Sequence, residues 1–118
     1  MFYVGNEIWM ERQEDFYDLP GFKNFSGCIR YSNGDKAWYV DSKIQSFQDL
    51  VTQEWMPAIV WADGRKDWYN KDEQQSFQNS VTKEWMPAVI WYDGSKEWYD
   101  KGMPVRNPET YHWKTIDF

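Results

Sequence analysis

Short apolar runs separated by turn-forming pairs dominate most of the chain. Near its middle, Ile59-Val60-Trp61 and Trp68-Tyr69 stand on either side of Asp63-Gly64. Runs of β-branched and aromatic residues favour strands, and an Asp-Gly pair tolerates the positive φ angles of a two-residue hairpin turn. The pattern therefore predicts a β-hairpin whose turn lies at Asp63-Gly64.

The same pattern recurs every 30 residues. Residues 45–71 and 75–101 align without a gap and are identical at 18 of 27 positions. A more divergent copy at 28–39 has Asn33-Gly34 where the later copies have Asp63-Gly64 and Asp93-Gly94. A fixed period of this length indicates a repeat architecture. We predict a single repeat domain over 1–118, with repeats at approximately 25–54, 55–84 and 85–114 and a divergent N-terminal segment at 1–24.

The segments between the hairpins carry apolar residues at a helical spacing. Steps of three or four positions separate the apolar residues of the first segment: Ile44, Phe47, Val51 and Trp55. The second segment repeats the spacing, and one amphipathic helix would place each set on a common face. We therefore predict helical turns within 43–54 and 73–84. The predicted fold class is α+β, mainly β: three repeated β-hairpins in an antiparallel sheet with short linker helices.

A two-residue turn would fix the register of each hairpin and give the hairpin two different faces. Trp61 would then pair with Lys66 and Ile59 with Trp68, so that indoles, aliphatic side chains and lysines share one face. We predict that this face forms the core and that the opposite face contacts a partner. The predicted partner-binding residues are Tyr39, Tyr69, Tyr99, Asp67 and Glu97.

An alternative is that the indole face is a ligand platform. A row of indoles can stack on a base or a sugar, and a lysine ammonium group is attracted to the face of an indole ring through a cation–π interaction. The residues of this alternative platform are Trp38, Trp61, Trp68, Trp91, Trp98, Lys66 and Lys96.

Composition and charge narrow the class of protein. Aromatic residues make up 20% of the 118 residues, which favours a folded chain with an aromatic core. The formal net charge of −6, with lysines dispersed through the repeats, disfavours direct binding to nucleic acid. The sequence shows no signal segment and no apolar run of membrane-spanning length. We therefore expect a cytoplasmic protein without a membrane partner.

Residues that usually carry catalysis or bind metals are scarce. Cys28 is the single cysteine and His112 the single histidine. A catalytic nucleophile needs a neighbouring base, and a structural zinc ion needs about four Cys or His ligands. Cys28 aligns with Ala58 and Ala88 of the later repeats, which predicts a small buried residue. We predict that the protein is not an enzyme and uses no cofactor and no metal.

The repeated segments resemble a known class of hairpin repeats. PAIVWADGRKDWY and PAVIWYDGSKEWYDKG combine a Pro-Ala strand, an Asp-Gly turn and a Lys-x-Trp-Tyr strand. In this they are similar to the MORN-like hairpin-repeat proteins of phages and large DNA viruses. The resemblance implies a hairpin array with a viral accessory or protein-interaction role and without catalytic residues.

These observations predict a non-enzymatic accessory protein of phage or viral type that binds a host protein in the host cytoplasm. Inhibition of a host defence or regulatory protein by surface occlusion is the mode of action that we expect. The alternative function is binding of a small molecule or carbohydrate on the aromatic Trp/Lys platform.

Overall fold

The computed structural model describes residues 7–10 and 26–116, which contain thirteen short β-strands and no helix. The first strands are β1 (Glu7–Met10), β2 (Gly27–Tyr31), β3 (Lys36–Val40), β4 (Lys43–Ile44), β5 (Phe47–Gln48) and β6 (Trp55–Met56). The next are β7 (Ile59–Val60), β8 (Lys66–Asp67), β9 (Tyr69–Asn70) and β10 (Glu73–Gln74). The last are β11 (Val89–Ile90), β12 (Lys96–Asp100) and β13 (Met103–Val105). Apart from β1, the predicted divergent segment at 1–24 lies outside the described residues.

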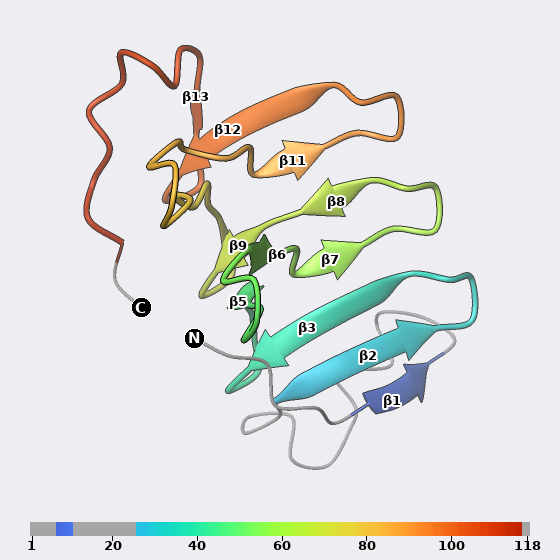
Figure 1. The fold of residues 1–118 in the computed structure, drawn as a ribbon. Coiled ribbons are helices and arrows are strands. Elements are labelled where there is room, and N and C mark those ends of the chain that lie inside the picture. The colour runs from blue at the N-terminus through green and yellow to red at the C-terminus, as the bar shows by residue number, and fades with distance from the viewer. Residues whose placement is uncertain (1–6, 11–25, 117–118) are drawn as a thin grey trace.

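Three equivalent hairpins form the main sheet, as the repeat pattern predicts. They pair β2 with β3, β7 with β8 and β11 with β12, all antiparallel. Each hairpin also pairs with the next, through β3 with β7 and β8 with β11. Figure 1 shows the hairpins side by side in one sheet, with β1 parallel to β2 at one edge and β13 beside β12 at the other. The mainly β class and the hairpin array are thus confirmed.

The hairpin turns contain three residues rather than the predicted two. In the second hairpin, the Gly64 amide donates a hydrogen bond to the Trp61 carbonyl oxygen at 3.0 Å, and the Trp61 amide donates to the Arg65 carbonyl oxygen at 2.9 Å. Gly64 has a φ of +100°, whereas Asp63 does not have a positive φ. This combination is a type I turn followed by a glycine bulge. One more residue in the loop shifts the register of the two strands by one.

The shifted register regroups the side chains, so the predicted pairing is wrong. Ile59 pairs with Asp67, not with Trp68, and Val60 pairs with Lys66. A slip of one residue moves every side chain of a strand to the other face. We call one side of the sheet the tyrosine face: Ile59, Trp61, Asp67, Tyr69 and their counterparts in the other repeats. We call the other side the lysine face: Val60, Lys66, Trp68 and their counterparts.

The predicted linker helices are absent from the described residues, and small hairpins take their place. In the first linker, Asp49 Oδ1 accepts hydrogen bonds from the amides of Val51 and Thr52 at 2.8 and 2.9 Å. A side chain that binds nearby backbone amides competes with helix formation. The loop keeps a single helix-like hydrogen bond, from the Gln53 amide to the Asp49 carbonyl oxygen at 2.9 Å. The β-branched Val51 and Thr52 favour the same outcome.

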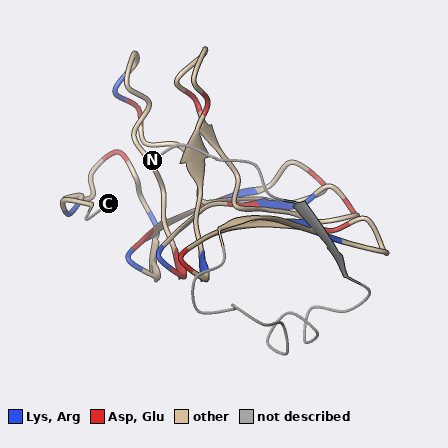
Figure 2. Cartoon of the chain, turned by 90° about the horizontal axis from the view of Figure 1, so that it is seen from below, with Lys and Arg blue, Asp and Glu red and all other residues tan. Residues whose placement is uncertain are grey.

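The two small hairpins project from the lysine face. The first is β5–β6, and the second spans residues 77–86 with a β-bridge between Gln78 and Trp85. Trp68 on the lysine face donates from Nε1 to the Trp55 carbonyl oxygen at 2.8 Å, and Trp98 makes the same bond to Trp85. Figure 2 shows both hairpins rising from the same side of the sheet. We call them the projecting hairpins.

A second type of turn, which the sequence analysis did not predict, reverses the chain after each Tyr-containing strand. Two successive residues with positive φ form each of these turns: Asp41-Ser42, Lys71-Asp72 and Lys101-Gly102. Two positive φ angles define a type I′ turn. These turns join β3 to β4, β9 to β10 and β12 to β13.

Buried Gln-Ser pairs lock each repeat to the next. Gln75 and Ser76 are 1% and 0% exposed. Gln75 Oε1 accepts a hydrogen bond from the Lys101 amide at 2.9 Å. The Ser76 amide donates to the Tyr99 carbonyl oxygen at 2.8 Å, and Ser76 Oγ accepts from the Tyr99 amide at 3.1 Å. The pair at 45–46 makes the equivalent contacts one repeat earlier. The buried polar groups are therefore paired with backbone of the following repeat.

Candidate functional site

The five predicted partner-binding residues all lie on the tyrosine face. Tyr39 and Asp67 are buried there, at 5% and 1% exposure, and Tyr39 belongs to an apolar core cluster with Ile29, Tyr31, Ala37 and Ile59. Tyr69, Tyr99 and Glu97 are half-buried. The accessible part of the predicted surface is therefore these last three side chains.

A carboxylate and an indole form a repeated pair on this face. Asp67 accepts a hydrogen bond from Trp61 Nε1 at 3.3 Å, and Glu97 accepts one from Trp91 Nε1. Glu97 also accepts a hydrogen bond from the Tyr99 hydroxyl at 2.9 Å. That hydrogen bond, together with burial, raises the pKa of Tyr99 above its usual range. The Tyr99 phenol therefore stays protonated, and continues to donate to Glu97, to a higher pH than an ordinary tyrosine would.

Arg65 lies between two indoles that come from neighbouring repeats. Its Cζ is 4.2 Å from the ring centroid of Trp91 and 5.6 Å from that of Trp61. Its Nε and Nη2 donate to the two carboxylate oxygens of Asp67 at 2.8 and 3.0 Å. A guanidinium that pairs with a carboxylate in this two-pronged way and also stacks on an aromatic ring is held in one geometry.

The alternative ligand platform is divided between the two faces of the sheet. Five of its residues belong to the lysine face: Trp38, Trp68, Trp98, Lys66 and Lys96. The other two, Trp61 and Trp91, belong to the tyrosine face, because their Nε1 atoms donate to Asp67 and Glu97 on that face. The structure therefore does not bring the seven residues together into one surface.

Exposed aliphatic side chains lie at the tips of the projecting hairpins. Leu50 and Val51 at the tip of the first hairpin are 72% and 90% exposed, and Val81 at the tip of the second is 81% exposed. Asn79 holds the second tip as Asp49 holds the first, because its Oδ1 accepts hydrogen bonds from the amides of Val81 and Thr82. Both tips thus present apolar groups on loops with the same hydrogen-bonded conformation.

A hollow of about 220 Å³ lies between the two projecting hairpins. Gln53 and Glu54 of the first hairpin and Asn79 and Met86 of the second contribute to its walls. Met86 is 41% exposed. The hollow therefore lies between the sides of the two hairpins, over Trp68 of the lysine face.

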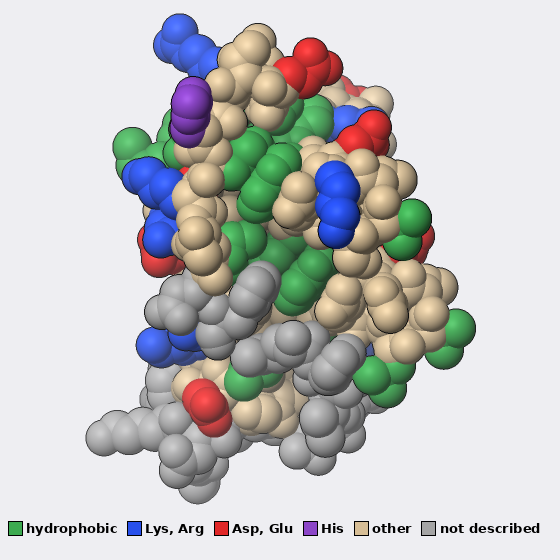
Figure 3. All heavy atoms as spheres, turned by 60° about the vertical axis from the view of Figure 1, so that its left-hand side comes forward, with side chains coloured by type: hydrophobic (Ala, Val, Ile, Leu, Met, Phe, Trp, Pro, Cys, Tyr) green, Lys and Arg blue, Asp and Glu red, His purple; other side chains and the backbone are tan. Residues whose placement is uncertain are grey.

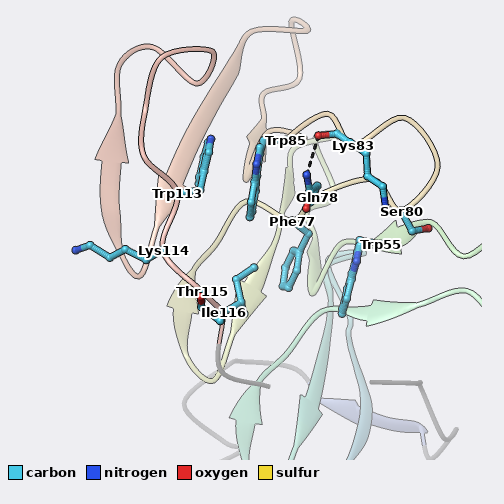
Figure 4. A pocket seen from close by; sticks show the side chains of 10 residues that line it. All are labelled: Trp55, Phe77, Gln78, Ser80, Lys83, Trp85, Trp113, Lys114, Thr115 and Ile116. Carbon is cyan, nitrogen blue, oxygen red and sulfur yellow. Dashed lines mark hydrogen bonds between the residues drawn. The ribbon is translucent and has the colours of Figure 1, made fainter.

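A larger aromatic cavity, of about 480 Å³, opens beside the second projecting hairpin. Figure 3 shows hydrophobic side chains gathered in a hollow on this side of the molecule. Two stacked pairs of rings line it: Trp55 on Phe77, with centroids 4.1 Å apart, and Trp85 on Trp113, with centroids 4.3 Å apart. Figure 4 shows Phe77 and Trp85 between their outer partners, with Ile116 at the lower end. The volume falls within the usual range of ligand pockets, about 300–1,000 Å³.

In this cavity Trp113 takes the role that Phe77 has beside Trp55. Trp55 of the first projecting hairpin stacks on Phe77 at the start of the second, and Trp85 is the counterpart of Trp55. The position that corresponds to Phe77 one repeat later is Asn107, so Trp113 provides the ring that stacks on Trp85.

The cavity residues are not recognisable as a site from the predicted elements. The spacing of Trp55 and Trp85 from Phe47 and Phe77 suits the common face of a linker helix, which hides their role in the cavity. The signal that could have found them is the unbroken segment Glu-Trp-Met-Pro-Ala, which is identical at 54–58 and 84–88. A residue that only had to face a core could differ between repeats, as Ile59 and Val89 do.

The single cysteine and histidine are not among the residues that line the hollow or the aromatic cavity. Cys28 is fully buried, like Ala58 and Ala88, as the alignment of the repeats predicts. His112 is exposed. Over residues 7–10 and 26–116, no three His, Cys, Asp or Glu side chains are grouped so that they could hold a metal ion. The same part of the chain contains no helix of the length and apolarity needed to cross a membrane.

Comparison of the chain with models of known protein families, with curated proteins and with solved structures finds no match.

Proposed function

We propose that this chain is a non-enzymatic binding protein that recognises another protein through its projecting hairpins. The observation that carries the proposal is the exposure of Leu50, Val51 and Val81 at 72%, 90% and 81%. Apolar side chains grouped on an exposed surface are typical of protein interaction sites, since water contact makes them costly.

The construction of the tips supports this function. Side-chain oxygens of Asp49 and Asn79 each bind two loop amides, so the loops are ordered before a partner arrives. Preorganised loops lose less conformational entropy on binding. The hollow between the two hairpins offers space for a side chain of the partner.

The resemblance to MORN-like repeats of phages and large DNA viruses supplies a narrower form of the proposal. In that form the chain is an accessory protein that occludes the surface of a host protein, with inhibition of a defence or regulatory factor as the consequence. Its negative net charge suits a basic partner.

The test is capture of a partner with a variant that changes only the tips. We expect the wild-type chain to retain a defined host protein from a bacterial lysate, and the Leu50→Ser, Val51→Ser, Val81→Ser variant to lose it. A matched control is Tyr92→Ser, which removes a side chain that is 71% exposed on a different loop. Equal capture by the tip variant and the control, with both chains folded by circular dichroism, would show that the tips are not the contact surface.

The non-enzymatic part of the proposal has its own test. Replacing Cys28 by Ala and His112 by Ala should leave partner affinity unchanged, because neither residue lies on the proposed surface. Cys28→Ala only introduces the residue that the later repeats already have. Turnover of a substrate that disappears with either substitution would contradict the proposal.

A second candidate function is binding of a small molecule or carbohydrate, and the aromatic cavity is the observation that favours it. Flat indole and phenyl faces suit a sugar ring or a base. We expect a ligand in this cavity to quench Trp fluorescence in the wild type and not in Trp85→Ala. In Trp61→Phe, which changes an indole outside the cavity, the ligand-dependent change should persist. A screen of sugars and nucleotides that gives no saturable change would exclude these ligand classes.

A further inference from the structure

The third repeat lacks the cation that the second repeat places on its carboxylate. In the second repeat, Arg65 pairs with Asp67 through two hydrogen bonds. The residue at the position of Arg65 in the third repeat is Ser95, and the residue at the position of Asp67 is Glu97. Glu97 forms no ion pair with any residue in the described part of the chain.

The remaining parts of the arginine environment are present around Glu97. The Trp91 indole donates to one carboxylate oxygen, Oε2, and the Tyr99 hydroxyl donates to the other, Oε1, at 2.9 Å. A carboxylate offers about four acceptor positions, so two remain after these bonds. Glu97 and Trp91 are half-buried and Ser95 is exposed, so a side chain from outside can approach.

One face of Trp91 is covered by Arg65, whose Cζ lies 4.2 Å from the ring centroid. Trp61 in the preceding repeat has its own guanidinium neighbour, with the same Cζ 5.6 Å from its ring. Each hairpin places the residue after its turn across from its indole, because the Trp61 amide donates to the Arg65 carbonyl oxygen and the Trp91 amide to that of Ser95, at 2.9 and 2.8 Å. Since the strands follow one another in the order β7, β8, β11 and β12, Arg65 lies on one side of Trp91 and Ser95 on the other. The Ser95 side is where the next guanidinium in the series would lie.

We propose that Glu97 and the outer face of Trp91 form a recognition site for an arginine side chain of the partner protein. This inference rests on the proposed protein-binding function and specifies part of the partner's chemistry. Arginine fits better than lysine, because a planar guanidinium both stacks on an indole and binds a carboxylate through two hydrogen bonds. The formal net charge of −6 favours the approach of a basic surface.

The probe for this site is argininamide, with lysinamide as the comparison, followed by NMR of the Trp indole N–H signals. We expect argininamide to cause a saturable shift of the Trp91 indole signal. We expect lysinamide to bind with an affinity at least about fivefold lower, because only a guanidinium both stacks on the indole and forms two hydrogen bonds to the Glu97 carboxylate. Equal shifts with both compounds, or no saturable shift with argininamide, would overturn the assignment.

Two variants separate this site from general charge attraction. Ser95→Arg should place a guanidinium on Glu97 in the same way that Arg65 reaches Asp67, and so weaken argininamide binding about tenfold or more by occupying the site. Ser95→Ala, the matched control, should leave binding unchanged. Glu97→Gln should weaken binding at least about fivefold, since hydrogen bonds between charged groups are stronger than neutral ones.

Undiminished argininamide binding in Ser95→Arg, with dispersed NMR signals that confirm folding, would show that the ligand lies elsewhere. Because the probe is argininamide rather than a captured protein, failure here leaves the capture test of the projecting hairpins unaffected. Conversely, loss of partner capture in the tip variant does not alter the expected argininamide shift.

Discussion

Replacing Gln75 by Ala tests whether buried polar locks hold the repeats together. The Gln75 side chain is 1% exposed and makes three hydrogen bonds. It accepts one from the Lys101 amide at 2.9 Å, and it donates to the Ser76 carbonyl oxygen at 2.9 Å and to Asp100 Oδ1 at 3.3 Å. Each buried hydrogen bond contributes about 0.5–1.5 kcal/mol net. The Asp100 carboxylate keeps other donors, so its share is small. We therefore expect the free energy of unfolding to fall by about 2–4 kcal/mol.

Gln78→Ala is the matched control for this experiment. Gln78 is exposed and makes one hydrogen bond, from Nε2 to the Lys83 carbonyl oxygen at 2.9 Å. The same atoms are removed only three positions away, and a surface substitution of this kind usually costs about 0.5 kcal/mol or less. Urea unfolding followed by Trp fluorescence gives both values from the midpoint and slope of each curve. A loss below about 1 kcal/mol for Gln75→Ala, or equal losses for the two variants, would refute the idea that the Gln-Ser pairs lock the repeats.

Two further predictions concern the turns and the tips. Gly34→Ala should destabilise the chain more than Gly64→Ala. Both glycines have a φ near +100°, but of the two only Gly34 would bring a new Cβ against another side chain, that of Ala62 at 3.2 Å. Thermal unfolding of the two variants measures the difference. The amides of Thr52 and Val51 that donate to Asp49 lower the pKa of its carboxyl group in the folded chain. The ionised carboxylate therefore stabilises the first tip fully at any pH above the pKa of Asp49 in the unfolded chain. This stabilisation is lost as the pH falls through the lower pKa of the folded chain, below about pH 4. Amide exchange should therefore show the first tip loosening in acid and the second tip, held by the non-titrating Asn79, remaining ordered, whereas Asp49→Asn should remove the difference.

Local sequence determined the repeat and the places where the chain turns. The 30-residue period, the three glycine-containing turns and the small buried residue at Cys28 all depend on residues close together in the chain, and the structure has each of them. Strand and turn preferences act over a few residues, so one repeat contains the information needed.

Tertiary structure decided the register, because the sequence of the turn is compatible with two loop lengths. Asp63-Gly64 fits a two-residue type I′ turn and also the end of a three-residue loop in which only Gly64 has a positive φ. The observed loop places Asp67 opposite Ile59, and Asp67 opposite Val89 of the next hairpin. The choice between the loops therefore involves pairing with neighbouring hairpins as well as the turn residues themselves.

The candidate sites likewise depend on residues that are far apart in the sequence. The aromatic cavity needs Phe77 beside Trp55 and Trp113 beside Trp85, and the arginine environment needs Trp91 next to Arg65. None of these pairs is adjacent in sequence, and the helical spacing of the linkers suggested another use for the tryptophans. Asp49 and Asn79 bind the amides of the linkers and so favour hairpins over helices there. Contacts between successive units then create these surfaces. The sequence thus determined the repeating unit, whereas the contacts between successive units decided where binding can occur.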